Sequence, residues 1–208
     1  WQIDEHTLRS RRRRWSLAAV LAVALFADLL WPPPLPRTHA DANTSHAQVV
    51  LARDGTPLRA FPDKAHIWRN PVQLGEVSPR YVEAVLAYED RWFYRHPGVN
   101  PISFLRAIAQ AVWNGRVVSG GSTLTMQVAR LLEPIPRTPL GKLKQLWRAL
   151  QLDWRFDKSQ ILEIYLNLAP FGGTIEGVQA ASHAYLGKSA TQLSDAEAAL
   201  LVVLPQAP

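Results

Sequence analysis

Residues 89–100 read EDRWFYRHPGVN, and the helix that the sequence predicts before them fixes where the first side chain points. Ser78 followed by Pro79 predicts a helix start, because serine caps helix N-termini and proline fits the first turn. The apolar residues of this helix then recur at the spacing of a core face: Val82, Val85 and Leu86. Glu89 lies three residues after Leu86, so it falls on the same face at the C-terminal end of the helix.

A carboxylate in that position is unfavourable unless it has a function. Burial and the negative end of the helix dipole would both raise the pKa of Glu89, as a general base or acid working near neutral pH requires. The alternative is a helix-ending glutamate that forms an ion pair with Arg91 or Arg95. The spacing alone leaves both interpretations open.

Composition limits the class of protein. The chain has 208 residues, enough for one domain with a sizeable core plus appendages. It carries 23 Lys and Arg against 17 Asp and Glu, with a pI near 10.0, which favours anionic partners such as nucleic acid, anionic lipid or a phosphorylated substrate. Cysteine is absent, which excludes disulfides, thiol catalysis and thiolate metal sites.

The N-terminal part predicts a membrane anchor. Arginines crowd residues 1–14, and an apolar run follows at residues 15–31, broken only by Asp28. A helix of that length reaches about 25 Å, the short end of what crosses a bilayer core. The arginines predict that residues 1–14 stay in the cytoplasm and that the rest of the chain lies outside. The alternative is a signal peptide cleaved near Ala40.

The remainder divides into a linker and one domain. Residues 32–47 are Pro-rich and polar, which predicts an extended linker. Residues 48–61 predict a small β-hairpin, with a turn near Gly55. After Ser78 the patterns are almost entirely helical, so we expect a mainly α-helical domain over residues 48–208.

The next predicted helix leads into a glycine-rich start of another. One apolar face of this next helix carries Ile102, Leu105, Ile108, Ala109 and Val112, and Asn114 with Gly115 ends the helix. Gly120 and Gly121 then precede the hydroxyl residues Ser122 and Thr123 at a helix start. Free backbone N–H groups, hydroxyls and the positive dipole end together favour an anion site there. Ordinary N-capping by one of the hydroxyls is the alternative.

A basic helix is predicted from Thr138 and Pro139 onward. Its apolar stripe consists of Leu143, Leu146, Trp147, Leu150 and Trp154. Four cations crowd its N-terminal part, namely Arg137, Lys142, Lys144 and Arg148. Cations oppose the dipole at that end, so we expect an anionic partner, with a solvated basic face as the alternative. Capping boxes open two later helices, at Asp157–Gln160 and Ser194–Glu197.

Five blocks in this order resemble the peptidoglycan glycosyltransferase domain (family 51) of class A penicillin-binding proteins, nearest its 1C type. The blocks are Glu89-Asp90 with Phe93 and His96-Pro97-Gly98, Gly120 to Thr125 with Gln127, Lys142 with its neighbours, Ile161-Leu162-Glu163 with Tyr165-Leu166-Asn167, and Gly177 with Tyr185 to Lys188. Any one block is a weak signal, whereas five in order are a strong one. The resemblance covers residues 48–208, and in that family a transpeptidase domain follows.

The resemblance implies a lysozyme-like, two-lobed, mainly α-helical fold, with one lobe dipping into the membrane. It implies polymerisation of lipid II into glycan strands with release of undecaprenyl diphosphate, and Glu89 as the general base beside Asp90 and His96. The positions that match the donor-diphosphate site are Ser122, Thr123, Gln127, Arg130, Arg137 and Lys142. Other residues of the matching motifs are Phe93, Gly98, Arg106, Glu163, Tyr165 and Asn167. A divalent metal such as Mg²⁺ could share the diphosphate role.

The resemblance also implies partners and a location. These are lipid II, the growing glycan strand, membrane lipids and other cell-wall synthesis or division proteins, at the inner membrane with the domain on its periplasmic face. A nucleic-acid partner is not expected behind a membrane anchor.

Several positions depart from the family pattern. The second acidic residue is the amide Gln145, a usual arginine is Gly141, and Met126, Arg130 and Asn100 replace a glutamine, a lysine and an aspartate. Gln145 can donate and accept hydrogen bonds but cannot hold a metal ion by charge. The departures fit the 1C type and leave two alternatives to the enzyme. One is a module that binds lipid II without turnover, and the other is a lysozyme-like glycan hydrolase.

Overall fold

The computed structural model describes residues 48–53, 57–64, 66–115 and 121–206, together with residues 16, 19, 20, 23, 24 and 26–28. The chain divides into two units, residues 1–36 and residues 37–208. The described residues of the first unit are helical, and no helix in the described part of the chain is long and apolar enough to cross a membrane. The predicted anchor lies mostly outside the described residues, and the cytoplasmic segment and the linker lie entirely outside them.

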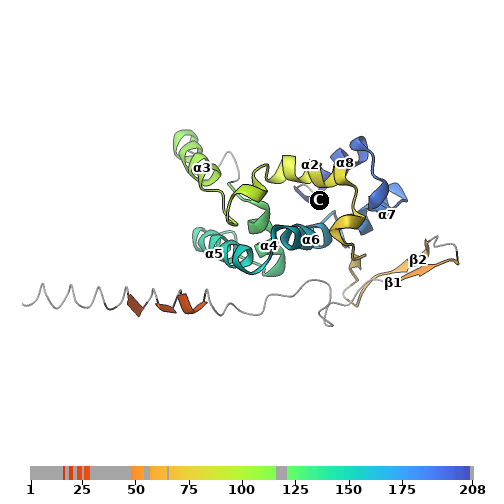
Figure 1. Cartoon of the computed structure of the whole chain (residues 1–208), viewed down its shortest axis with the longest axis horizontal. Helices are drawn as coiled ribbons and strands as arrows, with labels where there is room; N and C mark the ends of the chain where they lie inside the picture. The colour runs from red at the N-terminus through yellow and green to blue at the C-terminus, as the bar shows by residue number, and fades with distance from the viewer. Residues whose placement is uncertain are drawn as a thin grey trace, which may run out of the picture. The chain divides into compact units, whose positions relative to one another are not determined.

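The second unit is mainly α-helical, as the sequence predicts (Figure 1). Its helices are α2 (Pro79–Glu89), α3 (Pro101–Asn114), α4 (Leu124–Leu132), α5 (Pro139–Arg155), α6 (Lys158–Leu168), α7 (Val178–Leu186) and α8 (Asp195–Val203). Its strands are β1 (Gln48–Leu51), β2 (Pro57–Phe61), β3 (Trp68–Arg69) and β4 (Ile175–Glu176). Single 3₁₀ turns lie at Leu74–Glu76, Phe93–Arg95, Ala190–Gln192 and Leu204–Gln206.

The predicted hairpin is present, and a second small sheet accompanies it. Strands β1 and β2 pair antiparallel with Gln48 opposite Phe61, and the register shifts between Val50 and Leu51. Strands β3 and β4 pair in parallel although more than a hundred residues separate them, with Trp68 opposite Ile175. The sequence did not predict this second sheet, because a two-residue strand leaves no alternating pattern.

Helix starts and stops follow the capping signals. Thr138 caps α5 by accepting a hydrogen bond from the Gly141 N–H, and the capping boxes that open α6 and α8 are formed. Gly115 ends α3 with φ +62°, a conformation that glycine adopts at low cost. Ser78 stands at the start of α2 as predicted, but its hydroxyl donates to the Leu193 carbonyl at 3.2 Å and thereby ties α2 to the segment before α8.

The core of the second unit forms around α4, which packs against α5 and α6, while α2 packs against α8. Leu124, Met126 and Val128 of α4 are fully buried. Burying side chains of this size stabilises the fold by about 1.5–3 kcal/mol each. The helix that carries several candidate site residues is therefore held on two sides.

Two motif residues on α6 hold the backbone before α2. The Asn167 side chain accepts from the Val72 N–H and donates to the Val72 carbonyl, both at 2.8 Å. The Glu163 carboxylate accepts from the Leu74 N–H at 2.9 Å. These contacts give Glu163 and Asn167 a structural position, since unpaired backbone groups there would be costly to bury.

The apolar stripe of α5 is not its buried face. Leu143 and Trp154 are 63% and 74% exposed, and the buried face instead carries Gly141, Gln145, Ala149 and Leu152. Helix α4 packs against this face, where Gln145 donates to the Met126 carbonyl, and Gly141 and Ala149 lie close to the Pro136 carbonyl and to Gly98, so the larger side chains lie elsewhere on the helix. Leu143, Leu150 and Trp154 of the stripe therefore lie on the surface of this unit, whereas Leu146 and Trp147 are half-buried.

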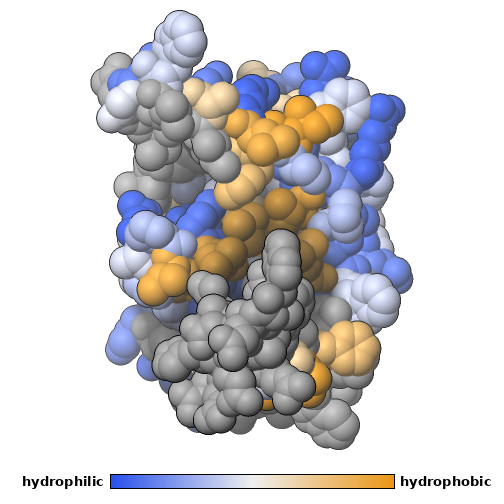
Figure 2. Space-filling model, turned by 90° about the vertical axis from the view of Figure 1, so that its left-hand side faces the viewer, coloured by the Kyte–Doolittle hydropathy of each residue, from blue (hydrophilic) through white to orange (hydrophobic). Residues whose placement is uncertain are grey.

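The apolar face of α3 is exposed as well, because Ile102 and Leu105 are 80% and 65% exposed. We call the following side chains the exposed apolar surface: Ile102, Leu105 and Trp113 of α3, with Leu140, Leu143, Leu150 and Trp154 of α5. Figure 2 looks from the side of α3 and α5 and shows hydrophobic residues gathered there. A surface of this kind on a soluble monomer normally contacts another molecule or a membrane.

Candidate active site

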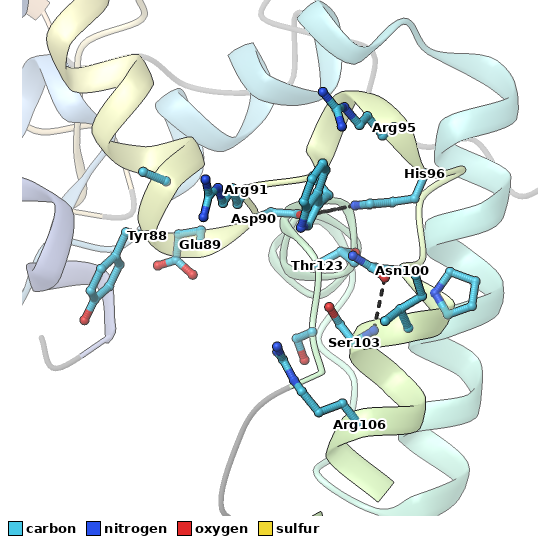
Figure 3. Close-up of a pocket in the computed structure, with 15 residues that line it drawn as sticks. Tyr88, Glu89, Asp90, Arg91, Arg95, His96, Asn100, Ser103, Arg106 and Thr123 are labelled. Atoms are coloured by element: carbon cyan, nitrogen blue, oxygen red, sulfur yellow. Dashed lines mark hydrogen bonds and ion pairs between the residues drawn. The ribbon is translucent and has the colours of Figure 1, made fainter. Parts of the chain in front are cut away.

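A cavity of about 600 Å³ opens where α2 ends, between the loop that follows, the first turn of α3 and the start of α4 (Figure 3). The predicted site residues that line it are Glu89, Asp90, His96, Arg106, Ser122 and Thr123. Arg106 extends from α3 into this cavity. The cavity therefore brings the motif at residues 89–100 together with the hydroxyl residues Ser122 and Thr123.

Glu89 is the last residue of α2 and is half-buried. The Gln127 side-chain amide donates to its Oε2 at 2.6 Å, and the Tyr165 hydroxyl from α6 also hydrogen-bonds its carboxylate. Burial, and then the charge of Glu89 and this hydrogen bond, raise the pKa of Tyr165 far above its usual range. The tyrosine therefore stays a neutral donor to the carboxylate.

A second buried tyrosine interacts electrostatically with the same carboxylate. Tyr81 of α2 is 1% exposed, and burial, Tyr165 and Glu89 in that order raise its pKa well above the usual value. The environment of Glu89 thus combines the neutral donors Gln127 and Tyr165 with partial burial, which strengthens its hydrogen bonds. The sequence did not predict the contact with Tyr165, because no local spacing relates α6 to the end of α2.

Asp90 connects the Glu89 loop to α4. Both of its carboxylate oxygens lie 3.0 Å from His96 Nε2, and its Oδ2 also accepts from the Leu124 N–H at 3.1 Å. The carboxylate facing Nε2 indicates that this nitrogen carries the proton. Asp90 and His96 are buried, so this pair sets the position of the loop rather than contacting bulk solvent.

Thr123 and Gly98 complete that connection. Thr123 caps α4 by accepting from the Met126 N–H at 3.2 Å and donates to the Gly98 carbonyl at 2.5 Å. Gly98 has φ +66°, and a Cβ there would lie 2.4 Å from the Ala149 carbonyl oxygen, so only glycine fits. The capping interpretation therefore holds for Thr123.

Phe93 lies under the same loop. It is 1% exposed, and Lys158 Nζ lies 4.7 Å from its ring centroid. The Lys158 ammonium also donates to the His96 carbonyl at 2.8 Å. This motif residue supports the loop from within the core.

A second pocket of about 310 Å³ lies between α4, the start of α5 and the loop before α5. We call it the cationic pocket, because the side chains that line it include Arg130, Arg137 and Lys142. Lys142 Nζ donates to Ser122 Oγ at 2.5 Å and to Gln145 Oε1 at 3.2 Å. Ser122 lines the first cavity, so this hydrogen bond joins the two sites.

No acidic side chain among the described residues neutralises the positive charge of the cationic pocket. Lys142 has only neutral hydrogen-bond partners, and among the described residues neither Arg130 nor Arg137 forms an ion pair. Burial, with a further contribution from Arg130, lowers the pKa of Lys142 from its usual value. The arrangement favours a bound anion, which would offset both effects.

The other two cations of the predicted basic helix are compensated. Lys144 pairs with Glu133 and Arg148 Nε lies 3.2 Å from the same carboxylate. The hydrogen bond from Lys144 is the main cause that lowers the pKa of Glu133. The expected anionic partner of Lys144 and Arg148 is thus the Glu133 carboxylate, whereas in the described part of the chain Lys142 has no acidic partner.

The residues present do not fit a divalent metal ion. Across the ranges the structure describes, no three His, Asp or Glu side chains lie close enough to hold one. The charged groups of the cationic pocket are cations, and the acidic position of the family pattern is the amide Gln145. Mg²⁺ prefers carboxylate oxygens, and this pocket offers none.

Residues 54–208 match the protein family Transglycosylase. The chain therefore belongs to the transglycosylase family. Its relatives include penicillin-binding protein 1C of Escherichia coli K12, which is 57% identical over 206 residues covering 97% of this chain and 26% of that protein.

Further relatives are penicillin-binding protein 1A of Escherichia coli K12, 36% identical over 85% of this chain and 21% of that protein, and penicillin-binding protein 1A of Aquifex aeolicus, 40% identical over 66% of this chain and 19% of that protein. The chain thus spans about a quarter or less of the length of these relatives. The crystal structure of penicillin-binding protein 1A from Haemophilus influenzae matches 79% of this chain and 14% of that chain, with 22% sequence identity and a TM-score of 0.37.

Proposed function

We propose that this chain is a peptidoglycan glycosyltransferase that polymerises lipid II and releases undecaprenyl diphosphate. The observation that carries the proposal is the junction at Ser122, where the cavity of Glu89 meets the cationic pocket. A sugar whose reacting carbon bears a diphosphate needs a base on one side and cations on the other. The family to which the chain belongs supports the same reaction class.

In the proposed reaction Glu89 takes the proton of the acceptor 4-hydroxyl as its oxygen attacks the anomeric carbon of the donor. A new C–O bond forms, and the bond to the diphosphate breaks with its electron pair leaving on the diphosphate. The hydrogen bonds from Gln127 and Tyr165 orient the Glu89 carboxylate for this step. Asp90 and His96 act indirectly, because they fix the loop that follows Glu89.

The cationic pocket stabilises the charge that develops on the leaving group. Lys142, Arg130 and Arg137 supply charge, and the Ser122 hydroxyl supplies a short polar contact beside Lys142. Charge-assisted hydrogen bonds of this type are about twice as strong as neutral ones. The donor groups are held in the pocket before the reaction, which lowers the cost of reorganisation in the transition state.

The proposal includes the membrane. Lipid II is embedded in a bilayer, and the exposed apolar surface of α3 and α5 gives the domain a face that can enter the lipid interface. With the predicted anchor at residues 15–31 and the lysozyme-like two-lobed fold that the resemblance implies, the domain would work on the periplasmic face of the inner membrane. Membrane lipids and the growing glycan strand are then its neighbours.

A lipid II-binding module without turnover is the second candidate. It is favoured by one observation, the buried amide Gln145 in place of the second acidic residue. The two candidates make the same contacts with the diphosphate and differ only in whether Glu89 performs chemistry.

The test is polymerisation of lipid II by the purified chain in detergent. We expect glycan polymer from the parent and none from Glu89→Gln, which keeps the shape but cannot accept the proton. Glu83→Gln is the matched control, because Glu83 is an exposed glutamate on the same helix. Polymer from Glu89→Gln at the parental rate would refute the assignment, and binding of lipid II without any polymer would establish the second candidate.

A further inference from the structure

The feature that the proposed mechanism leaves unexplained is Gln145, a side chain of α5 that is only 6% exposed. Both ends of its amide are used. Nε2 donates to the Met126 carbonyl at 2.6 Å, and Oε1 accepts from Lys142 Nζ at 3.2 Å. Only an amide can perform both tasks, because a carboxylate cannot donate to the Met126 carbonyl.

This double contact fixes the position of a cation. Lys142 is a long, flexible side chain that loses rotamer freedom when it is held in one place. The Lys142 ammonium donates one hydrogen bond to Gln145 and one to Ser122, and its third N–H remains available. Gln145 is itself held by α4, so Lys142 is placed with respect to the start of that helix.

The charge of Lys142 is preserved by the same contact. A carboxylate at position 145 would neutralise Lys142 and repel an incoming anion, whereas the amide does neither. The groups that face Lys142 are Ser122 and Arg130 of the α4 side, Arg137 of the preceding loop and Gln145 of its own helix. None of these groups carries a negative charge.

Position 141 shows that the cations of this pocket are arranged differently from the family pattern. A Cβ on Gly141 would lie 2.0 Å from the Pro136 carbonyl oxygen, so no longer side chain fits there. Arg137, in the loop before α5, lines the same pocket. Arg137 of the loop can therefore supply the positive charge that Gly141 lacks.

We infer that the cationic pocket binds a diphosphate without a divalent metal ion, and that Gln145 is the positioning residue which holds Lys142 for this task. The inference rests on the proposed function, since that function supplies a lipid-linked diphosphate as the ligand. The chemistry recognised is the diphosphate group itself, whether free or attached to a lipid.

The experiment measures binding of inorganic diphosphate to the purified chain by calorimetry in EDTA. The parent should bind, and Gln145→Glu should bind roughly tenfold or more weakly, as expected when a charge-assisted contact is neutralised. Gln145→Met should also weaken binding, because Lys142 keeps its charge but loses its position. Lys144→Met is the matched control, since Lys144 lies on the same helix but pairs with Glu133, and its affinity should equal that of the parent.

A pH series separates positioning from a merely structural role. Lys142 must be protonated to bind the anion, so the affinity of the parent should fall as the pH rises and Lys142 loses its proton. Because burial lowers the pKa of Lys142, this fall should occur at a lower pH than it would for a lysine with the usual pKa. In Gln145→Glu the new carboxylate should move this fall to higher pH. The parent and the variants are compared at the same pH, so that the titration of the diphosphate itself affects all of them equally. Thermal melting shows whether each variant is folded.

Each result decides the matter. Binding by the parent only after Mg²⁺ is added, or parental affinity in Gln145→Glu, overturns the inference. Repeating the titration with undecaprenyl diphosphate in detergent tells a lipid-linked ligand from a free one. Diphosphate binding in EDTA without polymer from lipid II leaves the inference standing and refutes the proposed turnover. Polymer from lipid II together with diphosphate binding that requires Mg²⁺ supports the proposed turnover and refutes the inference.

Discussion

The hydrogen bond from Tyr165 to Glu89 leads to a quantitative prediction. Tyr165→Phe removes one hydroxyl from a side chain that is 2% exposed and leaves the ring in place, so the packing of α6 changes little. The lost contact is a hydrogen bond to a charged group, which contributes about 1.5–3 kcal/mol. Because Glu89 is only half-buried, water can replace part of the lost hydrogen-bond energy, so the lower figure applies.

A loss of about 1.4 kcal/mol corresponds to a factor of ten in rate. We therefore expect kcat for lipid II polymerisation to fall roughly tenfold in Tyr165→Phe. The KM should stay near the parental value, because Tyr165 lines neither the cavity of Glu89 nor the cationic pocket. Initial rates over a range of lipid II concentrations separate the two constants.

The control is Tyr185→Phe, which deletes the same hydroxyl from a tyrosine that donates to the Phe171 carbonyl at 2.8 Å. Its kcat should remain parental. An unchanged kcat in Tyr165→Phe, or a change confined to KM, would show that the hydroxyl does not support the carboxylate during the reaction.

Three further predictions concern stability, membrane contact and pH. Gly98→Ala should lower the melting temperature by several degrees, because the added Cβ meets the Ala149 carbonyl; melting followed by circular dichroism checks this, and parental stability would contradict it. The double variant Trp113→Ser with Trp154→Ser should bind anionic vesicles at least several-fold more weakly in sedimentation, with unchanged affinity for inorganic diphosphate. Lipid II turnover should fall on the alkaline side as Lys142 loses its proton, and in Lys142→Arg, whose charge persists, the fall should vanish from the pH profile.

Local chemistry predicted the boundaries of the helices well. Thr138, the capping boxes and Gly115 each act within one or two helical turns, so their effect can be recognised in the sequence without knowing the fold. The same holds for the hairpin and for the placement of Glu89 at the end of α2.

Which face of a helix is buried could not be predicted in this way. The stripe of α5 had the correct helical spacing, but α4 packs against the face that carries Gln145, and which face a partner helix contacts depends on the arrangement of both helices. The contact of Tyr165 with Glu89 and the pairing of Glu133 with Lys144 and Arg148 likewise join segments that no local pattern relates.

Two neighbouring residues of α4 face different parts of the proposed site. The side chain of Gln127 holds the carboxylate of Glu89, while the carbonyl of Met126 holds the amide that places Lys142. A rotation or shift of this helix would therefore displace the base and the cation together. The separation between the group that accepts the proton and the group that receives the leaving anion is built into one turn of helix, and substrates must conform to that fixed distance.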